Sequence, residues 1–459
     1  MVVERERERE RERKKLLLIN PVNQFRQGLA MDHYALTPPL CLGIIAAYTP
    51  ADWKIRILDE NFFPFRFRTA DLVGITAYTP NVYRAYQIAA EYRKHNIPVV
   101  MGGIHVSMCT EEALQHADCV VVGEAEGIWP RVIADFEAGR LQKVYYGSRD
   151  ELADQRIPRH DLYDPRYVWR SVQTSRGCPM DCDFCSVTSF NGGKFRFRPI
   201  PQILDELEAF HGDGRNIFFV DDNIGGITKA HQERAMEFFQ GIIDRKLKFP
   251  WFSQTSLDIA DNDEVLKLAA ASGCKLLLVG IETETPESLG SMNKRINLKK
   301  GAENYRKIIR KFHKHGIAVF GTFIFAAETD KPENILARAD FINRLNVDAI
   351  QTSILTPYPG TKLRARLEEQ GRVTSKDYPA DWQYYNWEDI VFRHPYIESQ
   401  ELALLMDQAW KKIYNPSRLK GRCFQTLMNT RSPKAALWSY LCSNQYRKVM
   451  FEQPIHICG

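Results

Sequence analysis

The segment Arg170-Ser-Val-Gln-Thr-Ser-Arg-Gly-Cys178-Pro-Met-Asp-Cys182-Asp-Phe-Cys185 joins a predicted strand, residues 170–174, to a run of three cysteines. Three thiolates this close together can each hold one corner of a cubane iron–sulfur cluster, because cysteine thiolates are the usual ligands of such clusters. The run supplies no fourth cysteine, so one iron would stay open to an outside ligand. The segment therefore predicts a cluster that takes part in chemistry, not one used only to carry electrons.

Six predicted strands alternate with helices in the part of the chain that contains this cysteine run. Six strand–helix repeats are too few for a closed eightfold barrel, so we predict a partial (β/α)6 barrel over residues 169–365. Catalytic groups gather at the carboxyl ends of the strands in such folds, which is where the cysteine run falls. The strands are predicted at 170–174, 216–220, 250–255, 275–279, 318–325 and 349–355, and the helices at 201–210, 230–245, 263–271, 299–315 and 332–343.

A separate α/β series precedes the barrel, over residues 16–147. Apolar strands that alternate with helices predict a doubly wound, Rossmann-like parallel sheet with helices on both faces. Sheets of this class bind ligands at the carboxyl ends of their strands. The strands are predicted at 16–20, 55–59, 72–76, 99–103 and 119–123, and the helices at 40–48, 82–95, 111–116 and 128–138.

The remaining segments are a linker and the two ends of the chain. Residues 148–168 are polar and contain two prolines, which is typical of a linker. Residues 1–15 carry five Glu-Arg repeats and are predicted to form a disordered arm. Beyond the barrel the alternation stops, and we expect a basic helical domain over 366–459, with amphipathic helices at 399–414 and 434–446.

The composition excludes several classes of protein. Hydrophobic residues make up 44% and charged residues 26% of the 459 positions, as in ordinary globular domains. Ten cysteines are too few for a disulfide scaffold at this length, and no secretory signal or membrane-spanning run is visible, so we expect a reducing, cytoplasmic setting. A net charge of +5 is too small to imply a nucleic-acid partner by itself.

A structural zinc site is the main alternative for the cysteine run. Structural zinc commonly takes four ligands in two pairs. No second pair is visible, because His160 and His211 are isolated and Cys274 lies far downstream. A redox disulfide matches less well, since it needs only two cysteines. We therefore favour a three-cysteine iron–sulfur site.

The Cys-x3-Cys-x2-Cys spacing, with Phe184 before the last cysteine, resembles the radical S-adenosylmethionine (SAM) enzymes over residues 165–365. The resemblance implies that Cys178, Cys182 and Cys185 hold a [4Fe-4S] cluster whose open iron binds the amino and carboxylate groups of SAM. It also implies that an electron from the reduced cluster cleaves the sulfonium, and that a 5′-deoxyadenosyl radical then takes hydrogen from an unreactive carbon. The protein orients such cofactors and keeps water out.

Further cofactor contacts follow from the same resemblance. The segment Phe219-Val-Asp-Asp-Asn223 matches the one that contacts the methionine part, where acidic groups would accept hydrogen bonds from the ammonium; a helix cap or turn is the alternative. Glu282 ends the fourth strand, where a carboxylate would accept the ribose hydroxyls; a structural ion pair is the alternative. Lys294 or Arg295 would meet the cofactor carboxylate, although a surface charge is favoured for both. The residues expected to bind SAM are therefore Asp221, Asp222, Asn223, Gln254, Ser256 and Glu282.

One position departs from the family pattern. The fifth strand reads Gly321-Thr-Phe-Ile-Phe-Ala-Ala-Glu328, and many relatives carry a second glycine where Ala326 stands. The backbone there passes close to the adenine. The alanine therefore implies a slightly altered adenine contact.

The first domain resembles the amino-terminal domain of cobalamin-binding radical enzymes over residues 16–145. This resemblance is less specific than the cysteine run, because doubly wound sheets hold many ligands. It implies that cobalamin carries a methyl group between SAM and the substrate radical. The segments that match are Thr37–Gly43, Val99–His105 and Val121–Gly127, and the expected cofactor contacts are Gly102, Gly103, His105 and Gly123.

The Asp-x-His-x-x-Gly motif that supplies a cobalt ligand is absent from this domain. The resemblance then implies cobalamin bound without a histidine ligand, and a domain that has lost the cofactor is the alternative. For His105 itself, hydrogen bonding within the loop is favoured over contact with the corrin.

The carboxyl-terminal region is basic. Nine Lys or Arg and one acid, Glu452, lie between Lys411 and Gly459, with aromatic residues interleaved. A solvated helical cap over the barrel mouth is the favoured interpretation, followed by peripheral contact with an anionic membrane and then by RNA binding. We expect the segment Asp381–Trp387 beside the substrate pocket.

The favoured function is cobalamin-dependent methylation of an unactivated carbon in a lipid or secondary metabolite, with an external reductant of the flavodoxin or ferredoxin type. A second hypothesis keeps the cluster without the corrin, as in radical coupling, cyclisation or methylthiolation. Cys41, Cys109 and Cys119 lie in separate segments, which argues against methylthiolation. A third is an RNA-binding protein with structural zinc, although we expect no nucleic-acid partner. No catalytic acid or base is assigned, since a radical step needs no fixed carboxylate pair.

Overall fold

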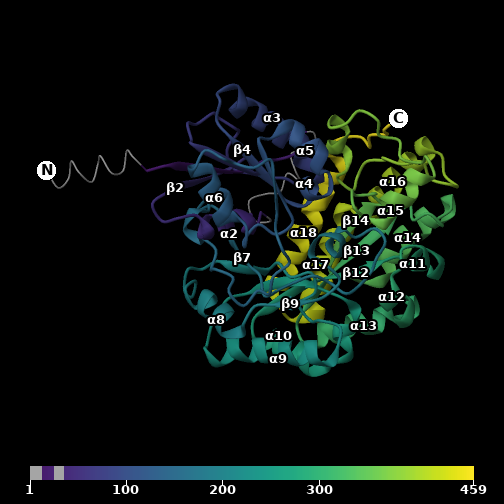
Figure 1. Ribbon diagram of the computed structural model, residues 1–459. Helices are drawn as coiled ribbons and strands as arrows, with labels where there is room; N and C mark the ends of the chain where they lie inside the picture. The colour runs from purple at the N-terminus through teal and green to yellow at the C-terminus, as the bar shows by residue number, and fades with distance from the viewer. Residues whose placement is uncertain (1–12, 25–35) are drawn as a thin grey trace. The chain divides into compact units, whose positions relative to one another are not determined.

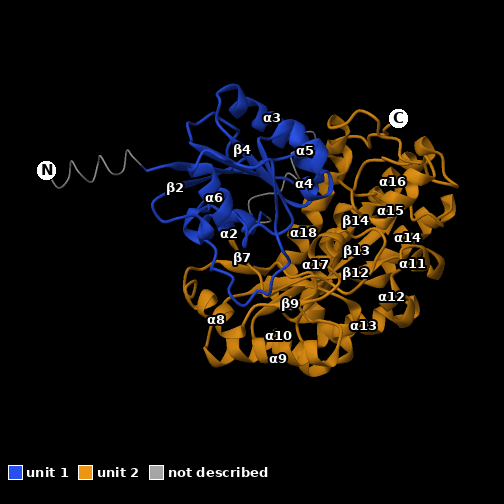
Figure 2. Ribbon diagram, viewed as in Figure 1, with its two compact units in different colours: residues 1–28, 36–167 blue, residues 29–35, 168–459 orange. Residues whose placement is uncertain are grey.

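The computed structural model describes residues 13–24 and 36–459, which divide into two compact units (Figures 1 and 2). Unit 1 contains residues 13–24 and 36–167, and unit 2 contains residues 168–459. Both are built of a parallel sheet with helices, which confirms the predicted α/β fold class. Most of the predicted disordered arm at 1–15 lies outside the described residues.

Unit 1 is a six-stranded parallel sheet in the order β2-β1-β3-β4-β5-β6. The leucines of β1 are almost fully buried, because helices cover both faces of the sheet. The strand order reverses between β1 and β3, which is where a sheet of this class opens a crevice for ligands. The strands are β1 (Lys15–Asn20), β2 (Lys54–Asp59), β3 (Leu72–Thr76), β4 (Val99–Gly102), β5 (Cys119–Val122) and β6 (Val144–Tyr146), and the helices are α2 (Leu40–Tyr48), α3 (Val82–Lys94), α4 (Ile104–Met108), α5 (Thr110–His116) and α6 (Trp129–Glu137).

Unit 2 is an open parallel sheet of six strands in the order β14-β13-β12-β11-β10-β7, which we call the barrel sheet. It confirms the predicted partial (β/α)6 barrel. The strands are β7 (Trp169–Val172), β10 (Asn216–Phe219), β11 (Trp251–Thr255), β12 (Cys274–Glu282), β13 (Ala318–Phe325) and β14 (Ala349–Ile354). The helices between them are α7 (Ser186–Asn191), α8 (Ile200–Glu208), α9 (Lys229–Asp244), α10 (Asp263–Ala271), α11 (Pro286–Ser291), α12 (Arg295–Lys300), α13 (Tyr305–Lys314) and α14 (Pro332–Leu345).

Several details of unit 2 differ from the sequence-based expectation, and the short helices α7 and α11 were not predicted. The predicted helix at 299–315 is two helices, α12 and α13, which are divided at Gly301, where φ is +71°. A left-handed residue cannot continue a right-handed helix. Two short strands that were not predicted, β8 (Ser175–Arg176) and β9 (Arg196–Phe197), pair across the cysteine loop.

The carboxyl-terminal helices belong to the same compact unit as the barrel sheet. They are α15 (Lys362–Glu369), α16 (Ser399–Ile413), α17 (Pro416–Thr430) and α18 (Pro433–Glu452), and α17 was not predicted. On α18, Trp438 packs 4.8 Å from the ring of Trp169, and Tyr446 packs 5.8 Å from that of Phe320. Both partners stand near the amino ends of their strands. Helix α18 therefore closes the amino-terminal end of the barrel sheet, and it is not a cap over the mouth.

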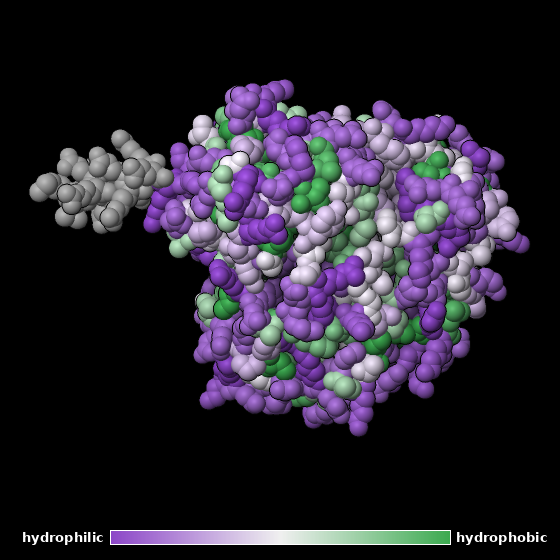
Figure 3. All heavy atoms as spheres, in the orientation of Figure 1, coloured by the Kyte–Doolittle hydropathy of each residue, from purple (hydrophilic) through white to green (hydrophobic). Residues whose placement is uncertain are grey.

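The surface in Figure 3 is hydrophilic over most of its area, and its apolar residues form small separate patches. Across residues 13–24 and 36–459, no helix combines the length and the apolar character that a bilayer crossing requires.

Candidate active site

The three cysteines lie in a loop at the carboxyl end of β7, an edge strand of the barrel sheet. The pairing of β8 with β9 closes the base of this loop. Gly177 precedes Cys178 with a φ of +89°, and a Cβ there would stand 2.2 Å from the carbonyl oxygen of Lys194. Only glycine fits where the chain turns from the sheet into the cysteine run.

Two neighbouring segments hold the cysteine loop in place. The side-chain amide of Asn293 donates a hydrogen bond of 2.5 Å to the carbonyl of Asp181. The carbonyl of Asp183 accepts from the backbone of Leu363 at 2.9 Å, and the Asp183 carboxylate pairs with Arg366 at 2.8 Å. The loop is thus fixed from the α11–α12 connection and from α15, so the positions of the sulfurs are set by the fold.

The three thiols are half-buried and none forms a disulfide. Burial raises the pKa of Cys178 to about 11 and that of Cys185 to about 12, and it also raises the pKa of Cys182. A bound metal would have to supply the charge that holds them as thiolates. Within the described ranges, no three His, Cys, Asp or Glu side chains gather closely enough to hold a single ion. The fit of an iron–sulfur cluster therefore rests on three sulfur donors in one loop, with one corner left for another ligand.

Asp221 is fully buried after β10 and binds the end of β7. Its carboxylate accepts hydrogen bonds from the backbone amide of Thr174 at 3.1 Å, from the Thr174 hydroxyl at 2.8 Å and from the Ser175 hydroxyl at 2.5 Å. Both carboxylate oxygens are engaged. In this structure Asp221 positions the strand that leads into the cysteine loop, and its predicted contact with the SAM ammonium stays a prediction.

Asp222 is the carboxylate that stands beside the cysteine loop. One of its oxygens accepts from the backbone amide of Gly177 at 3.1 Å and from the side chain of Asn191 at 3.3 Å. The other makes no hydrogen bond within the part of the chain that the structure describes. Burial raises the pKa of Asp222 to about 6, so the group is ionised at neutral pH but gains from a cationic neighbour.

The other predicted residues at this edge are Asn223, Gln254 and Ser256. The side-chain amide of Asn223 donates to the hydroxyl of Ser256 at 2.7 Å, so these two link the ends of β10 and β11. Strand alternation puts Gln254 on the same face of β11 as Phe252, opposite the face of Trp251, which packs against Phe239 of α9. Its side-chain amide has no hydrogen-bond partner among residues 13–24 and 36–459, so it is available to a ligand.

Glu282 and Lys294 form a buried ion pair at the carboxyl end of β12. The Nζ atom of Lys294 lies 2.6 Å from Oε1 of Glu282, and Oε2 accepts from the hydroxyl of Thr322 at 3.2 Å. The same Nζ lies 5.8 Å from the ring centre of Phe184, within the cysteine loop. Burial lowers the pKa of Lys294, but the charge and hydrogen bond of Glu282, together with the charges of Cys182 and Cys185, outweigh burial and the net shift is upward.

This ion pair revises the expectation for two basic residues. Lys294 points into the site, so the favoured interpretation as a surface charge is wrong for it, whereas Arg295 is exposed. Gly280 makes the pair possible, because a Cβ at that position would stand 2.4 Å from Oε1 of Glu282 and 2.8 Å from Nζ of Lys294. A cation and an anion beside the cysteine loop suit an amino acid group that carries both charges.

Ala326 lies just after β13 with a φ of +60° and is fully buried. An L-residue with a side chain is strained in this left-handed region. Backbone geometry thus favours glycine at this position, and alanine retains that geometry at a cost. Glu282, with a φ of +64°, is left-handed as well.

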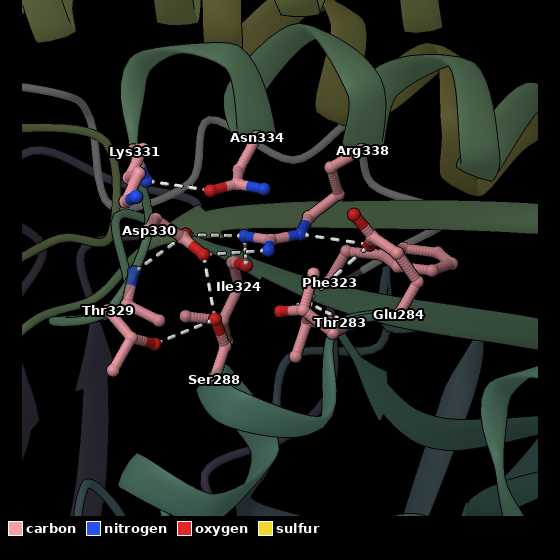
Figure 4. Close-up of polar contacts among 12 residues, drawn as sticks. Thr283, Glu284, Ser288, Phe323, Ile324, Thr329, Asp330, Lys331, Asn334 and Arg338 are labelled. Carbon is pink, nitrogen blue, oxygen red and sulfur yellow. Dashed lines mark hydrogen bonds and ion pairs between the residues drawn. The ribbon is translucent and has the colours of Figure 1, made fainter.

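A buried network behind the site holds the ends of β12 and β13 together (Figure 4). Arg338, on α14, forms two hydrogen bonds with Asp330, of 2.6 and 2.8 Å, and one of 3.1 Å with Glu284. It also donates to the carbonyl of Ile324 at 2.9 Å, while Asp330 accepts from Ser288 on α11 at 2.8 Å. The network fixes the two strand ends that carry Glu282 and Ala326.

Sequence reasoning did not find this network. Asp330 and Arg338 are eight residues apart across a loop and a helix, a spacing that no local pattern marks. A lone arginine in an amphipathic helix ordinarily faces solvent. The one signal in the sequence was that Arg338 stands at the spacing of the apolar residues of α14, where an apolar side chain would be expected.

In unit 1 the predicted glycines stand at the carboxyl ends of β4 and β5. Gly103 has a φ of +105°, and a Cβ there would lie 2.5 Å from the carbonyl oxygen of Ala77, so the packing of two turns requires glycine. Gly123, with a φ of +82°, donates its amide hydrogen to the Ser107 hydroxyl at 2.9 Å. Turn geometry thus accounts for Gly103 and Gly123, and their contact with a cofactor, like that of Gly102, stays a prediction.

His105 lies inside unit 1. Its Nδ1 is 3.2 Å from the hydroxyl of Thr79, its Nε2 is 3.4 Å from Glu112, and the hydroxyl of Tyr86 donates to the same carboxylate at 2.9 Å. Burial lowers the pKa of His105 and favours the neutral ring. Both ring nitrogens are engaged, which agrees with the hydrogen-bonding interpretation and with a cofactor bound without a histidine ligand.

Two family matches follow the two units. Residues 34–133 match the B12 binding domain, and residues 172–342 match the radical SAM superfamily. The first match covers the carboxyl ends of β3, β4 and β5, and the second runs from β7 to α14 and contains the cysteine loop.

Named relatives match nearly the whole chain. It is 30% identical over 422 residues to the bacteriochlorophyllide d C-12(1)-methyltransferase of Chlorobaculum tepidum, a match that covers 89% of each sequence. It is 27% identical over 382 residues to the hopanoid C-2 methylase of Rhodopseudomonas palustris, which covers 79% of this chain and 72% of that protein.

The fold is also found among solved structures. The radical SAM methyltransferase TsrM from Kitasatospora setae, solved with cobalamin and a [4Fe-4S] cluster, matches with a TM-score of 0.64. The two share 19% identity over 78% of this chain and 75% of that one, a level that shows a shared fold.

Proposed function

We propose that this chain, which belongs to the radical SAM superfamily in its class with an amino-terminal B12 binding domain, methylates an unactivated carbon of a lipid or secondary metabolite. One observation carries the proposal: a single chain joins the three-cysteine loop to a B12 binding sheet. A methyltransferase is among the relatives that match across both.

The donor set in unit 2 fits a [4Fe-4S] cluster and SAM. Cys178, Cys182 and Cys185 would hold three corners of the cluster. When bound, these groups supply a 5′-deoxyadenosyl radical, and cobalamin supplies a transferable methyl group. The protein's own part is to fix the sulfurs, bind the zwitterionic end of SAM and exclude water.

The charged residues beside the loop suit that zwitterion. Lys294 would turn from Glu282 to the SAM carboxylate, which frees Glu282 to accept the ribose hydroxyls. Asp222 would use its available oxygen for the SAM ammonium. Each of these groups is desolvated, so its interaction with an opposite charge is stronger than in water.

The substrate would enter at the carboxyl ends of the barrel strands. There the backbone amide of Ile354, at the end of β14, donates to the carbonyl of Trp387 at 2.7 Å. This bond supports a position of the aromatic segment Asp381–Trp387 near the end of β14, where it would pack against an apolar substrate. The two named relatives act on a bacteriochlorophyllide and a hopanoid. By analogy we propose a largely apolar small molecule here.

The main test is anaerobic reconstitution with iron, sulfide and hydroxocobalamin, followed by incubation with SAM and a flavodoxin- or ferredoxin-type reductant. Hydrogen abstraction leaves 5′-deoxyadenosine and methyl transfer leaves S-adenosylhomocysteine, so the proposal requires both products. 5′-Deoxyadenosine without S-adenosylhomocysteine or bound corrin would support the corrin-free alternative. Zinc in place of iron, with neither product formed, would reject both enzyme hypotheses.

A binding measurement tests the role of Glu282 without turnover. In the reconstituted protein, Glu282→Gln should weaken SAM binding at least about tenfold, because a neutral amide is a poorer acceptor for two hydroxyls than a carboxylate. Glu287→Gln, at an exposed position on α11, is the matched control and should bind SAM normally. Equal affinity of both variants would remove Glu282 from the SAM site.

A further inference from the structure

Helices α17 and α18 pack side by side, and four of their exposed large apolar side chains come from α17 and the first two turns of α18. The exposed fractions are 65% for Phe424, 37% for Leu427, 62% for Met428 and 53% for Leu437. The thiol of Cys423 lies 3.6 Å from the carbonyl oxygen of Ala436, so Phe424 and Leu437 each stand one residue from this contact between the helices. The four side chains thus form one exposed face, which we call the hairpin face.

Cations surround the hairpin face. Lys420 lies on the same stripe of α17 as Phe424 and Leu427, at spacings of four and three residues, and the exposed Arg431 ends the helix one turn after Leu427. Arg418 and Lys434 are exposed as well, and among residues 13–24 and 36–459 none of these four cations is in an ion pair. The sequence from Gln408 to Phe451 contains no Asp or Glu.

The opposite side of the hairpin is firmly attached, so the exposed apolar groups are not the result of loose packing. Arg422 is buried and donates to the carbonyl of Val347 at 2.6 Å. The hydroxyl of Thr426 donates to Asp348 at 2.8 Å, and Trp438 packs on Trp169 of the barrel sheet. The hairpin therefore presents a rigid surface, with its apolar and basic groups already in place.

We propose that the hairpin face binds the surface of an anionic lipid bilayer. Apolar side chains can enter the boundary between headgroups and acyl chains, while the surrounding Lys and Arg bind lipid phosphates. A second copy of this chain is less suitable, since two such faces would bring like charges together. Single-stranded nucleic acid is less suitable as well, because Leu427, Met428 and Leu437 offer no ring for bases to stack on.

The position of the hairpin face is compatible with catalysis at the other end of the barrel. Trp438 contacts the first residue of β7. Lys434 is close enough to Lys275, at the start of β12, that the charge of Lys275 adds to the effect of burial in lowering the pKa of Lys434. The face therefore lies toward the amino ends of the barrel strands, whereas the cysteine loop lies at the carboxyl end. A membrane bound there would leave the mouth of the barrel open.

Vesicle sedimentation with the full-length holoenzyme tests this inference independently of turnover. Vesicles of phosphatidylcholine with 30% phosphatidylglycerol, a composition chosen for the assay, should bind the protein at low salt, and pure phosphatidylcholine vesicles should bind at least about tenfold less. Binding to the anionic vesicles should fall with salt, since surface charges are screened.

Two variants separate the apolar from the basic contribution. Phe424→Ser with Met428→Ser should weaken binding about tenfold at all salt concentrations. Lys420→Glu with Arg431→Glu should weaken it at least about tenfold at low salt and remove most of the salt dependence. Leu404→Ser, at a residue of α16 that is 65% exposed, is the control and should bind like the wild type. Far-ultraviolet circular dichroism should show every variant folded.

Several outcomes would overturn the inference. Wild-type protein that does not bind the anionic vesicles, or hairpin-face variants that bind as well as the control, would do so. Concentration-dependent dimerisation that both hairpin variants abolish would assign the face to a second copy of the chain. Salt-dependent binding to a single-stranded RNA oligonucleotide, but not to vesicles, would assign it to nucleic acid. None of these results bears on SAM cleavage, so the proposed function is tested separately.

Discussion

The carboxyl edges of the two parallel sheets are built by different means. In unit 2 the edge is charged: Glu282 pairs with Lys294, Asp330 pairs with Arg338, and Asp222 stands beside the cysteine loop. In unit 1 the carboxyl ends of β4 and β5 consist of turns with left-handed glycines, beside a histidine whose pKa is lowered by burial. Both edges lie where sheets of this class bind ligands.

The difference matches what each edge would hold. A cluster and a zwitterionic amino acid group require fixed charges and thiolates, which are costly to bury unless they are paired. A large macrocycle that needs no histidine ligand can be bound by backbone turns and shape. We therefore expect that removing cysteine sulfurs or buried charges costs unit 2 its cluster or its stability, while unit 1 retains its cofactor.

Replacing the three cysteines should separate the two cofactors. The triple variant of Cys178→Ala, Cys182→Ala and Cys185→Ala should lose the iron–sulfur cluster and all 5′-deoxyadenosine formation, because no thiolate ligands remain. Cobalamin binding to unit 1 should persist. Iron and sulfide analysis, product assay and the corrin absorption band measure the three quantities. Cys423→Ala is the control. A four-iron cluster that survives the triple change would refute the assignment.

Breaking the network of Figure 4 should destabilise the protein strongly. Arg338→Met leaves Asp330 and Glu284 buried without their partner, and we expect a loss of about 3–5 kcal/mol in the free energy of unfolding, measured in urea. Asp340→Ala is the matched control on the same helix. It removes an exposed ion pair with Lys412 and should cost less than about 1 kcal/mol. Similar losses for both variants would show that the buried network contributes no more to stability than an exposed ion pair.

The pH dependence of stability should carry the signature of Asp222. Its pKa is raised by burial from 3.8 to about 6, so between these values the native state holds a proton that the unfolded chain has released. Stability contributed by this group is therefore lost as the pH rises from about 4 to 6. Asp222→Asn should match the wild type near pH 4 and exceed it at pH 7, by an amount on the order of 2 kcal/mol.

Urea denaturation at several pH values measures this difference. Asp52→Asn, at an exposed position of unit 1, should follow the wild type at every pH. If Asp222→Asn gains nothing at neutral pH, the carboxylate is better solvated or paired than the structure indicates.

The smallest effect is expected at Ala326. Glycine there relieves left-handed strain worth about 1 kcal/mol but loses about as much through the entropy of the unfolded chain, so Ala326→Gly should change stability by less than about 0.5 kcal/mol. Ala327→Gly, at the next residue, has no such strain to relieve. It should destabilise by about 1 kcal/mol. Thermal unfolding of the two variants side by side makes the comparison, and equal losses would argue against strain at Ala326.

Much of the architecture was predictable because it depends on patterns of neighbouring residues. The buried strands are continuous apolar runs such as Leu16–Ile19, and the long helices show apolar residues at helical spacing. The cysteine run was recognisable for the same reason, since its spacing alone defines a donor set. Short elements were missed: β6, β8 and β9 are two or three residues long, too short to show a period.

Pairings between distant residues were not predictable to the same degree. Glu282 was expected to bind the ribose or to form an ion pair, but its partner Lys294 was interpreted as a surface charge. The hydrogen bonds that Asp221 accepts from Thr174 and Ser175 were not expected, and its contact with the cofactor stays a prediction. Such pairings depend on which strand ends become neighbours in the sheet, and no single segment contains that information.

The sequence by itself determined the two α/β units, the order of most of their elements and the loop of three cysteines, because strand and helix periods and ligand spacing are properties of neighbouring residues. Only the tertiary structure decided that Lys294 turns inward, that Arg338 joins the ends of β12 and β13, and that α18 closes the amino end of the barrel sheet. The physical reason is that burial and charge pairing are set by the segments that fold against one another, and these lie far apart in the chain.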